Sequence, residues 1–529
     1  MSRQPEFLTV PPTGPPGPPD AATAAAALVV AAVVAARVAD PGRVAGLVAA
    51  AARQTAHPGS VHWRDHAVGQ GHAGLALLFG ALDQRLPGEG WDRTAHRHLA
   101  LAARSAESLA SPPAGLFAGL AGVGLAASCL SGDGSRYRRL LATIDQALAA
   151  LAPALAARTG RAARGAPGRP RGVAVRELDL ISGLAGVGAY LLVRRAQPGV
   201  APALGAVLEG LVELTGADAD GPRWRTPPAS LRPTERARYP AGYLNCGLAH
   251  GIPGPLAVLA LAMQTGTEVA GLPAAVARTA DWLAAHRTED PSGPTWPHAI
   301  GLSGHRRDPP SPGQARAVAP PARPAGQPGH SVPAPPPAGP PRRAEPPGPG
   351  PPAPAPAGPG RPAERPGSSV PGPAPAGPGG PGEPPARSAW CYGGPGVAAA
   401  LRLAGEALGH DGHRDLAVAA LRAALARTDQ GRAVGSPSFC HGQAGLLAVT
   451  ASFARATGDA GFARAAAAMA AGLLDRFDPA APLGYRDLEA GGRAVDQPGL
   501  LTGAPGVALA LLGATSPAEP AWGRLFLLA

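Results

Sequence analysis

Three residues in the C-terminal part of the chain carry the side chains that zinc prefers. Cys391, Cys440 and His441 offer two thiolates and one imidazole, and a site with three protein ligands leaves a fourth position open for catalysis. No compact Cys-x-x-Cys pair accompanies them, so spacing alone also permits buried cysteines at tight helix starts. The residue types favour a catalytic zinc site, provided that the fold brings the three together.

A histidine and an aspartate could supply proton transfer beside that site. His250 is not among the expected ligands, and an unligated imidazole is the usual proton shuttle near neutral pH. Asp179 could hold such a histidine or stabilise its charged form. An aspartate before a helix is also an ordinary N-cap, so both roles for Asp179 stay open.

The remaining two cysteines fit other roles. Cys246 lies four residues before His250 and could compete as a ligand, but we interpret it as a wall or core residue. Cys129 lies in an apolar run and is interpreted as packing. Four cysteines are too few for a disulfide scaffold in 529 residues, which predicts reduced thiols and a cytoplasmic protein.

A repeated Gly-x-x-Gly followed by an apolar run must position these residues. Neighbouring copies begin 48 to 68 residues apart, except for an interval of 142 that falls to 62 without an 80-residue Pro/Gly-rich segment. Such a period indicates a repeat architecture. The first glycines of the seven copies are Gly71, Gly119, Gly183, Gly251, Gly393, Gly442 and Gly503.

The intervals between the copies predict helices. Segments such as 415–428 and 462–477 carry apolar residues at three- and four-residue spacing, whereas strand-like alternation is nearly absent. We therefore expect an all-α chain of seven helical hairpins, as an open solenoid or a closed double ring of helices, the α/α toroid. The glycines would let helices pack closely or let a ligand approach the backbone.

The candidate residues share positions in this repeat, which favours the closed ring. We number each unit from its first glycine. Position −2 is Cys391 in unit five and Cys440 in unit six. Equivalent positions should lie at one height on one rim. Position −1 of units one to seven is Gln70, Ala118, Ser182, His250, Tyr392, His441 and Thr502.

Composition divides the chain. Residues 309–388 hold 30 Pro and 14 Gly in 80 positions, which predicts a disordered insert, serving as an extended tether or present as a tolerated expansion of a surface loop. We expect a disordered tail at 1–19, units one to four of the toroid at 20–308, and units five to seven at 389–529. The apolar run 21–36 is better explained as a first core helix than as a signal peptide or membrane span.

The net charge of +11 comes from 47 arginines and no lysine, alongside 36 acids. This usage is typical of GC-rich coding, so it is not taken as evidence for nucleic acid, and no nucleic-acid partner is expected. One basic cluster is either a solvated loop or a dock for an acidic peptide segment. It consists of Arg158, Arg161, Arg164, Arg169, Arg171 and Arg176.

With LAHGIPGP at 248–255, WCYGGPG at 390–396 and CHGQAG at 440–445, the chain resembles the lanthipeptide synthetase C, or LanC-like, cyclases. WPHAIG at 296–301 and AWGRLFLL at 521–528 are also similar to that family. The resemblance covers the chain outside its N-terminal tail and the insert. No kinase-like or dehydratase domain precedes it, so the resemblance is to the free-standing cyclase.

The resemblance implies a seven-fold toroid with one zinc ion per chain, held by Cys391, Cys440 and His441. It further implies that His250, Asp179, Arg387 and Tyr392 occupy active-site positions. Arg387 is the weakest match because the insert runs directly into it.

The implied reaction adds a cysteine thiol of a dehydrated ribosomal precursor peptide to dehydroalanine or dehydrobutyrine, giving lanthionine or methyllanthionine. A dehydratase and a membrane exporter are the implied partners, at the inner face of the membrane. Two other classes remain as alternatives: a different zinc-thiolate alkyl transferase and a non-catalytic peptide-binding toroid. Only 21 aromatic residues and no lysine argue against a lipid diphosphate substrate.

Overall fold

The computed structural model describes residues 21–57, 62–132, 134–165, 171–302, 387–427, 431, 433–489 and 491–529. The predicted tail at 1–19 lies outside the described residues, as does the predicted insert up to residue 386. Both therefore stay predictions.

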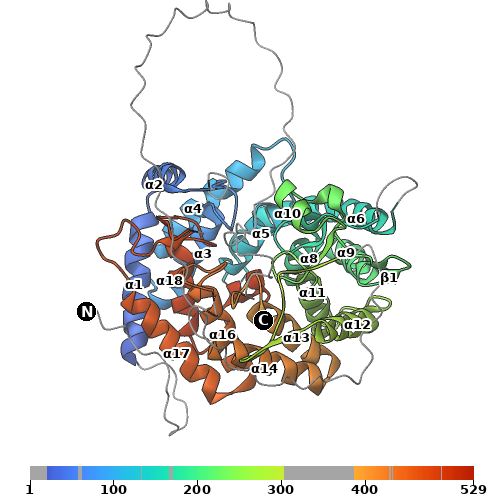
Figure 1. Cartoon of the computed structure of the whole chain (residues 1–529). Helices are drawn as coiled ribbons and strands as arrows, with labels where there is room; N and C mark the ends of the chain where they lie inside the picture. Colours follow the sequence, from blue (N-terminus) through green and yellow to red (C-terminus); the bar gives the residue numbers. More distant parts are fainter. Residues whose placement is uncertain are drawn as a thin grey trace, which may run out of the picture. The chain divides into compact units, whose positions relative to one another are not determined.

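Seven helices form a closed inner ring in the described part of the chain. Each begins in one Gly-x-x-Gly and contacts the helix of the next unit, and the last contacts the first. Their faces are buried nearly all round, which suits helices that are apolar on every side. In Figure 1 they surround the centre of the ring, and they are α3 (His72–Arg85), α5 (Leu120–Cys129), α8 (Leu184–Val193), α11 (Pro253–Gln264), α13 (Gly394–Leu408), α16 (Gln443–Thr457) and α18 (Ala504–Ala514).

An outer layer of helices packs against this ring, each on the inner helix of its own unit. The helices predicted at 415–428 and 462–477 begin earlier than expected, at Asp411 and Ala460. Side chains just before them explain the shift, since Asp459 accepts hydrogen bonds from the Gly461 and Phe462 amides. The outer helices are α4 (Trp91–Glu107), α6 (Arg138–Arg164), α9 (Val200–Leu214), α12 (Leu272–Ala285), α14 (Asp411–Ala426) and α17 (Ala460–Asp475).

The seventh outer helix comes from the other end of the chain. α1 (Ala21–Val38) packs against α18, α17 and α3, so the N-terminal helix completes the last unit. The predicted helix is therefore observed, but in the outer layer and with only one face buried, rather than in the core. By length and composition α1 and α6 could each span a membrane, but each packs one face on inner helices. The helices α2 (Pro41–Gln54), α7 (Val175–Leu178) and α10 (Pro233–Arg238) and the 3₁₀ turn η1 (Pro228–Ser230) lie in connections.

A ring of seven backbone hydrogen bonds runs through position −2. The amide of that residue donates to the carbonyl of its counterpart in the next unit, at 2.8–3.3 Å, and unit three uses the adjacent Leu180 amide instead of Ile181. The chain of donors returns from Leu501 to Gly69. Equivalent positions of the seven units therefore lie at the same level of the ring, as predicted. The donors in order are Gly69, Phe117, Leu180, Ala249, Cys391, Cys440 and Leu501.

The second glycine of every copy is required for packing. A Cβ there would lie 2.0–2.9 Å from the carbonyl oxygen of position −3 in the same unit, as at Gly445, 2.0 Å from the Phe439 oxygen. Real Cβ atoms do not approach backbone so closely, so the helix start needs glycine. Of the two roles that the sequence allowed for these glycines, close packing accounts for the motif.

Among the residues that the structure describes there are four antiparallel pairs of very short strands, although the sequence shows almost no strand-like alternation. They escaped prediction because two or three residues are too few to show alternation. β3 (Tyr243–Asn245) pairs with β6 (Ala299–Gly301), and β7 (Asp487–Leu488) pairs with β8 (Ala494–Val495). β1 (Ala217–Asp218) pairs with β2 (Gly221–Pro222), and β4 (Thr288–Asp290) pairs with β5 (Gly293–Thr295).

The C-terminal 3₁₀ turn η2 (Ala521–Phe526) packs inside the ring, where it contacts α5 and α8. Phe526 stacks on Phe439 at 3.8 Å, and its carbonyl accepts a hydrogen bond from the Trp390 indole at 2.9 Å. Trp390 and Phe439 each precede a candidate cysteine by one residue. This aromatic cluster thus supports the backbone that carries Cys391 and Cys440.

Candidate active site

Cys391 and Cys440 lie side by side at position −2 of units five and six. The Cys391 amide donates to the Cys440 carbonyl at 3.2 Å, and the two thiols are hydrogen-bonded to each other. Both are free thiols. The hydrogen bond from Cys440 outweighs burial and lowers the pKa of Cys391 to about 7, while the same contact and burial raise the pKa of Cys440. The contact therefore makes Cys391 the more acidic of the two thiols.

His441 is held by a buried carboxylate that the sequence analysis missed. Its Nε2 lies 3.0 Å from Oδ1 of Asp487, a residue of β7 that is 5% exposed. Burial lowers the pKa of His441, but the charge and the hydrogen bond of Asp487 outweigh it and raise that pKa overall. Because a carboxylate oxygen only accepts hydrogen bonds, Nε2 carries the hydrogen, and Nδ1 is the ring nitrogen that does not contact Asp487.

Cys391, Cys440 and His441 are the residues whose side chains could hold a metal ion. Within the described residues, no group of three or more His, Cys, Asp or Glu side chains is close enough to form a ready ligand cluster. The chemistry of Cys391, Cys440 and His441 nevertheless fits zinc, because two thiols are in contact and the third residue is an imidazole with a carboxylate behind it.

His250 and Asp179 meet as the sequence suggested. His250 Nδ1 lies 2.7 Å from Asp179 Oδ2, while Asp179 Oδ1 accepts from the amides of Ser182 and Gly183 at 2.8 and 2.9 Å. Asp179 is 1% exposed. Asp179 therefore holds the histidine through Oδ2, while Oδ1 binds the turn that leads into α8, whose N-cap is Gly183 and not Asp179.

Tyr392 lies between two histidines. Its ring stacks on His298 at 3.8 Å and faces His250 at 6.2 Å, and its hydroxyl accepts from the Asn245 amide at 3.2 Å. Burial raises the pKa of Tyr392 well above its usual value. Burial, with the charges of His250 and Arg387, lowers the pKa of His298 to about 4.

His298 and Asn245 were also missed by the sequence analysis. Asn245 ends β3 and His298 directly precedes β6, so the strand pair brings both to Tyr392. Neither occupies the repeat position used to find the other residues. The WPHAIG motif at 296–301 was a signal for His298 that went unused.

Arg387 is the first described residue after the gap at 303–386. A Cβ on Gly393 would lie 1.4 Å from the Arg387 carbonyl oxygen, and Gly393 has φ of +96°, so the chain turns tightly between the two. The Arg387 charge contributes to the lowered pKa of Cys391 and opposes the rise in the pKa of Cys440. Arg387 thus lies within electrostatic reach of the thiol pair.

The other two cysteines are not in the thiol pair, although the Cys246 amide donates to the His298 carbonyl at 3.0 Å. The Cys246 thiol is buried and points to the Leu244 carbonyl at 3.7 Å. Burial raises the pKa of Cys129 to about 12. Both observations agree with the packing roles that were predicted.

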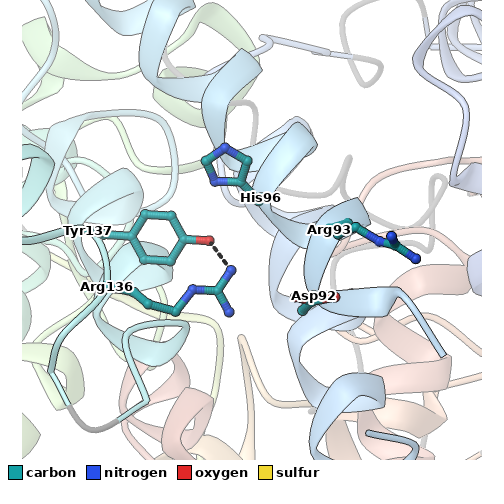
Figure 2. Close-up of a pocket in the computed structure, with 5 residues that line it drawn as sticks. All are labelled: Asp92, Arg93, His96, Arg136 and Tyr137. Atoms are coloured by element: carbon teal, nitrogen blue, oxygen red, sulfur yellow. Dashed lines mark hydrogen bonds between the residues drawn. The ribbon is translucent and has the colours of Figure 1, made fainter. Parts of the chain in front are cut away.

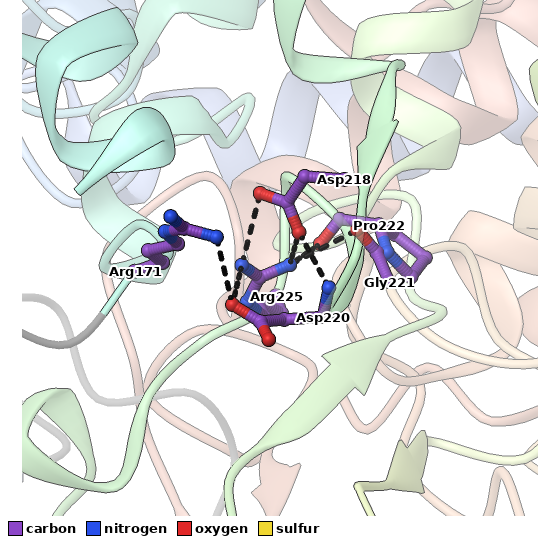
Figure 3. A network of polar contacts seen from close by, with 6 residues as sticks. All are labelled: Arg171, Asp218, Asp220, Gly221, Pro222 and Arg225. Atoms are coloured by element: carbon purple, nitrogen blue, oxygen red, sulfur yellow. Dashed lines mark hydrogen bonds and ion pairs between the residues drawn. The ribbon is translucent and has the colours of Figure 1, made fainter. Parts of the chain in front are cut away.

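Half of the basic cluster is paired with acids of the same chain. Arg158 pairs with Glu177, Arg164 with Glu213, and Arg171 with Asp220. Figure 3 shows the last pair beside Arg225, whose two terminal nitrogens donate to the two carboxylate oxygens of Asp218 at 3.0 and 3.1 Å. Arg169 lies outside the described residues. The solvated loop that the sequence allowed is only partly correct, because Arg158, Arg161 and Arg164 lie in α6 and Arg176 lies in α7. The exposed ion pairs leave fewer free arginines for an acidic peptide segment.

A surface pocket of about 450 Å³ contains none of the predicted site residues. Figure 2 shows His96 and Arg136 on either side of Tyr137, whose hydroxyl accepts from Arg136 at 3.3 Å. The ring of His96 stacks on Tyr137 at 5.8 Å. The pocket is lined by Asp92, Arg93, His96, Arg136 and Tyr137.

Comparisons with known proteins agree with this architecture. A family model described as lanthionine synthetase C-like protein matches residues 62–311 and 378–527. Among solved structures, the chain is similar to a nisin cyclase, with a TM-score of 0.63 and 17% identity over 88% of this chain and 93% of that one. A search of curated proteins gave no match. The predicted all-α, seven-fold α/α toroid is confirmed.

Proposed function

Because the chain belongs to the lanthionine synthetase C-like family, we propose that it is a zinc-dependent cyclase of dehydrated ribosomal peptides. It would add cysteine thiols to dehydroalanine or dehydrobutyrine to form lanthionine and methyllanthionine. The observation that carries the proposal is the Cys391–Cys440 thiol pair, on the same rim as the His250–Asp179 pair.

Cys391, Cys440 and His441 would hold the zinc ion, one per chain. A zinc ion with an open position supplies one thing here: it lowers the pKa of a substrate thiol, so that a thiolate nucleophile exists at neutral pH. Arg387, within electrostatic reach of both cysteines, favours their ionised forms.

His250 would manage the proton. Asp179 accepts from its Nδ1, which leaves Nε2 bare and able to accept a proton. The S–H bond of the substrate breaks, a C–S bond forms at the β-carbon, and the α-carbon takes up one proton. The peptide mass does not change. His250 can accept the thiol proton and return it to the α-carbon, with Asp179 keeping the ring in place.

Arg387 and Tyr392 would shape the remainder of the site. Negative charge develops on the substrate carbonyl oxygen as the thiolate adds, and the Arg387 guanidinium can stabilise it. Tyr392, fixed by Asn245 and His298, would form the wall against which the peptide lies beside His250.

The required substrate also indicates where this chain works. Dehydro residues must be made by a separate dehydratase, and we propose that this enzyme and an exporter are its partners, in the cytoplasm at the inner face of the membrane. The alternative of a non-catalytic toroid is separated from the cyclase by zinc content, because a scaffold need not bind metal.

Substituting one cysteine ligand tests the proposal. We expect Cys440→Ala to lose zinc and cyclisation together, measured by atomic spectroscopy and by thiol labelling with mass spectrometry of a dehydrated precursor. Cys246→Ala is the matched control, since Cys246 is a buried cysteine close in sequence to His250 but outside the pair, and it should keep both. Stoichiometric zinc in the Cys440 variant would refute the ligand assignment.

A further inference from the structure

The Asp487 carboxylate is buried at the site without belonging to the ring of repeats. It begins β7 in the connection between units six and seven, and is 5% exposed. Its Oδ1 accepts from His441 Nε2 at 3.0 Å and from the Ser436 hydroxyl at 2.6 Å. Burying a carboxylate is costly unless it is hydrogen-bonded, and these contacts meet that need.

The hydrogen bonds around Ser436 determine where its hydroxyl hydrogen points. The Ser438 and Leu488 amides donate to the Ser436 oxygen at 3.2 and 3.3 Å. Because the hydroxyl accepts from the backbone, its own hydrogen is available to Asp487. Backbone amides thus position Ser436, and Ser436 in turn positions Asp487 beside His441.

The contact to Asp487 decides which nitrogen of His441 is bare. A carboxylate oxygen accepts and cannot donate, so Nε2 carries hydrogen. In the neutral ring Nδ1 then has the free lone pair, and this nitrogen lies closer to the backbone that joins His441 to Cys440. A bare imidazole nitrogen is the form that ligates a metal.

We infer that Asp487 is the positioning residue for His441, holding the imidazole in the Nε2–H form so that Nδ1 is the nitrogen offered to zinc. Ser436 holds Asp487 in turn. Carboxylate partners of this kind orient metal-ligating histidines and raise their basicity. The inference rests on the proposed function only in taking His441 as a ligand.

Three variants test this role. Asp487→Ala should weaken zinc binding about 10- to 100-fold, measured by competition with a chromophoric chelator. Asp487→Asn should stay within about 3-fold of the parent protein, because a single amide oxygen can replace Oδ1 for both His441 and Ser436. Ser436→Ala should fall between them.

The matched control is Asp496→Asn. Asp496 follows β8 in the same hairpin, is 4% exposed, and pairs with Arg486 at 3.3 Å rather than with His441. It should leave zinc affinity unchanged. Equal weakening by Asp496→Asn would show that hairpin stability, and not the contact to His441, controls the metal, and would overturn the inference.

The same measurements separate this inference from the proposed function. If the parent protein binds zinc and cyclises peptide while Asp487→Ala binds zinc equally tightly, only the positioning role fails. If the parent protein binds no zinc, the proposed function fails. Selective ¹⁵N labelling of histidine gives a readout without metal: the parent protein should show His441 with hydrogen on Nε2, and a signal for hydrogen on Nδ1 alone would overturn the inference.

Discussion

Two histidines occupy the same repeat position and are held in opposite ways. His250 in unit four presents Nδ1 to Asp179 at 2.7 Å, whereas His441 in unit six presents Nε2 to Asp487 at 3.0 Å. His250 therefore keeps Nε2 bare, the nitrogen farther from the backbone, which suits proton transfer to a substrate. His441 keeps Nδ1 bare, close to Cys440, which suits a ligand. A repeat fixes where a side chain starts, and the neighbouring carboxylate decides its chemistry.

The two carboxylates also differ in how their hydrogen bonds are divided between the oxygens. Asp179 divides its oxygens between His250 and the amides of Ser182 and Gly183. Asp487 receives both His441 and Ser436 on Oδ1, and Ser438 makes a further side-chain hydrogen bond to this carboxylate. An asparagine has one oxygen, which can accept from both His441 and Ser436 but cannot serve His250 and the two backbone amides together.

The largest expected effect comes from removing the histidine that is not a ligand. His250→Ala should lower the cyclisation rate by about 10²- to 10⁴-fold, the usual contribution of a general acid or base, with zinc content unchanged. His441→Ala should instead lose zinc. Zinc analysis and single-turnover cyclisation of both variants check this contrast. Loss of zinc from the His250 variant would break the division of roles between the two histidines.

A smaller but more specific effect is expected at Asp179. Asp179→Asn should reduce cyclisation by about 10²-fold, because the amide must abandon either the His250 ring or the two backbone amides. If the oxygen of the new amide side chain stays on the two backbone amides, its NH₂ group faces His250 Nδ1. That contact favours the tautomer with hydrogen on Nε2, which is the wrong one for accepting a proton there. Asp487→Asn is the matched comparison and should be nearly silent. Equal loss in both variants would contradict the difference in oxygen use.

Asp179→Ala extends the test to stability. It removes the hydrogen bonds to Ser182 and Gly183 as well, and should destabilise the fold by about 1 kcal/mol relative to Asp179→Asn. Denaturant unfolding of both variants measures the difference. Equal stability of the two would show that the oxygen on the amides contributes little.

The repeat made half of this site predictable. His250, Cys391, Cys440 and His441 follow from their position before a Gly-x-x-Gly, and a Cβ in the second glycine of each copy would strike the same backbone carbonyl. Asp487, Asn245 and His298 did not follow, because two- and three-residue strands outside the repeat carry or flank them. Their pairing depends on tertiary contacts that local sequence does not encode.

Closure of the ring was predictable only in outline. Seven copies with chemistry at one position favoured a toroid, and the hydrogen bonds that return from Leu501 to Gly69 confirm it. That α1 supplies the outer helix of the last unit was not foreseen. The apolar run indicated a helix, but Val38 lies 466 positions before the start of α18 at Ala504, and no pattern in either segment identifies its partner.

A pair of histidines without a close carboxylate partner extends the comparison to a third site. In unit one His72 Nδ1 lies 3.0 Å from His98 Nδ1, and His98 Nε2 donates to the Ala39 carbonyl at 3.1 Å. The nearest carboxylate contact is Asp65, 3.8 Å from His72. Burial is the main cause that lowers the pKa of His98 to about 4, and His72 and Arg97 add to it against Asp40.

This pair should make stability depend on pH. The unfolded chain binds a proton at His98 near pH 6.5 and the folded chain only near pH 4, so unfolding takes up a proton between these values. Stability is then fully present above pH 6.5 and falls as the pH drops toward 4, by about 1–2 kcal/mol between pH 7 and pH 5. Denaturant unfolding at both pH values measures the loss. His98→Gln should reduce the loss, since glutamine does not titrate, and an unchanged loss would place the titrating group elsewhere.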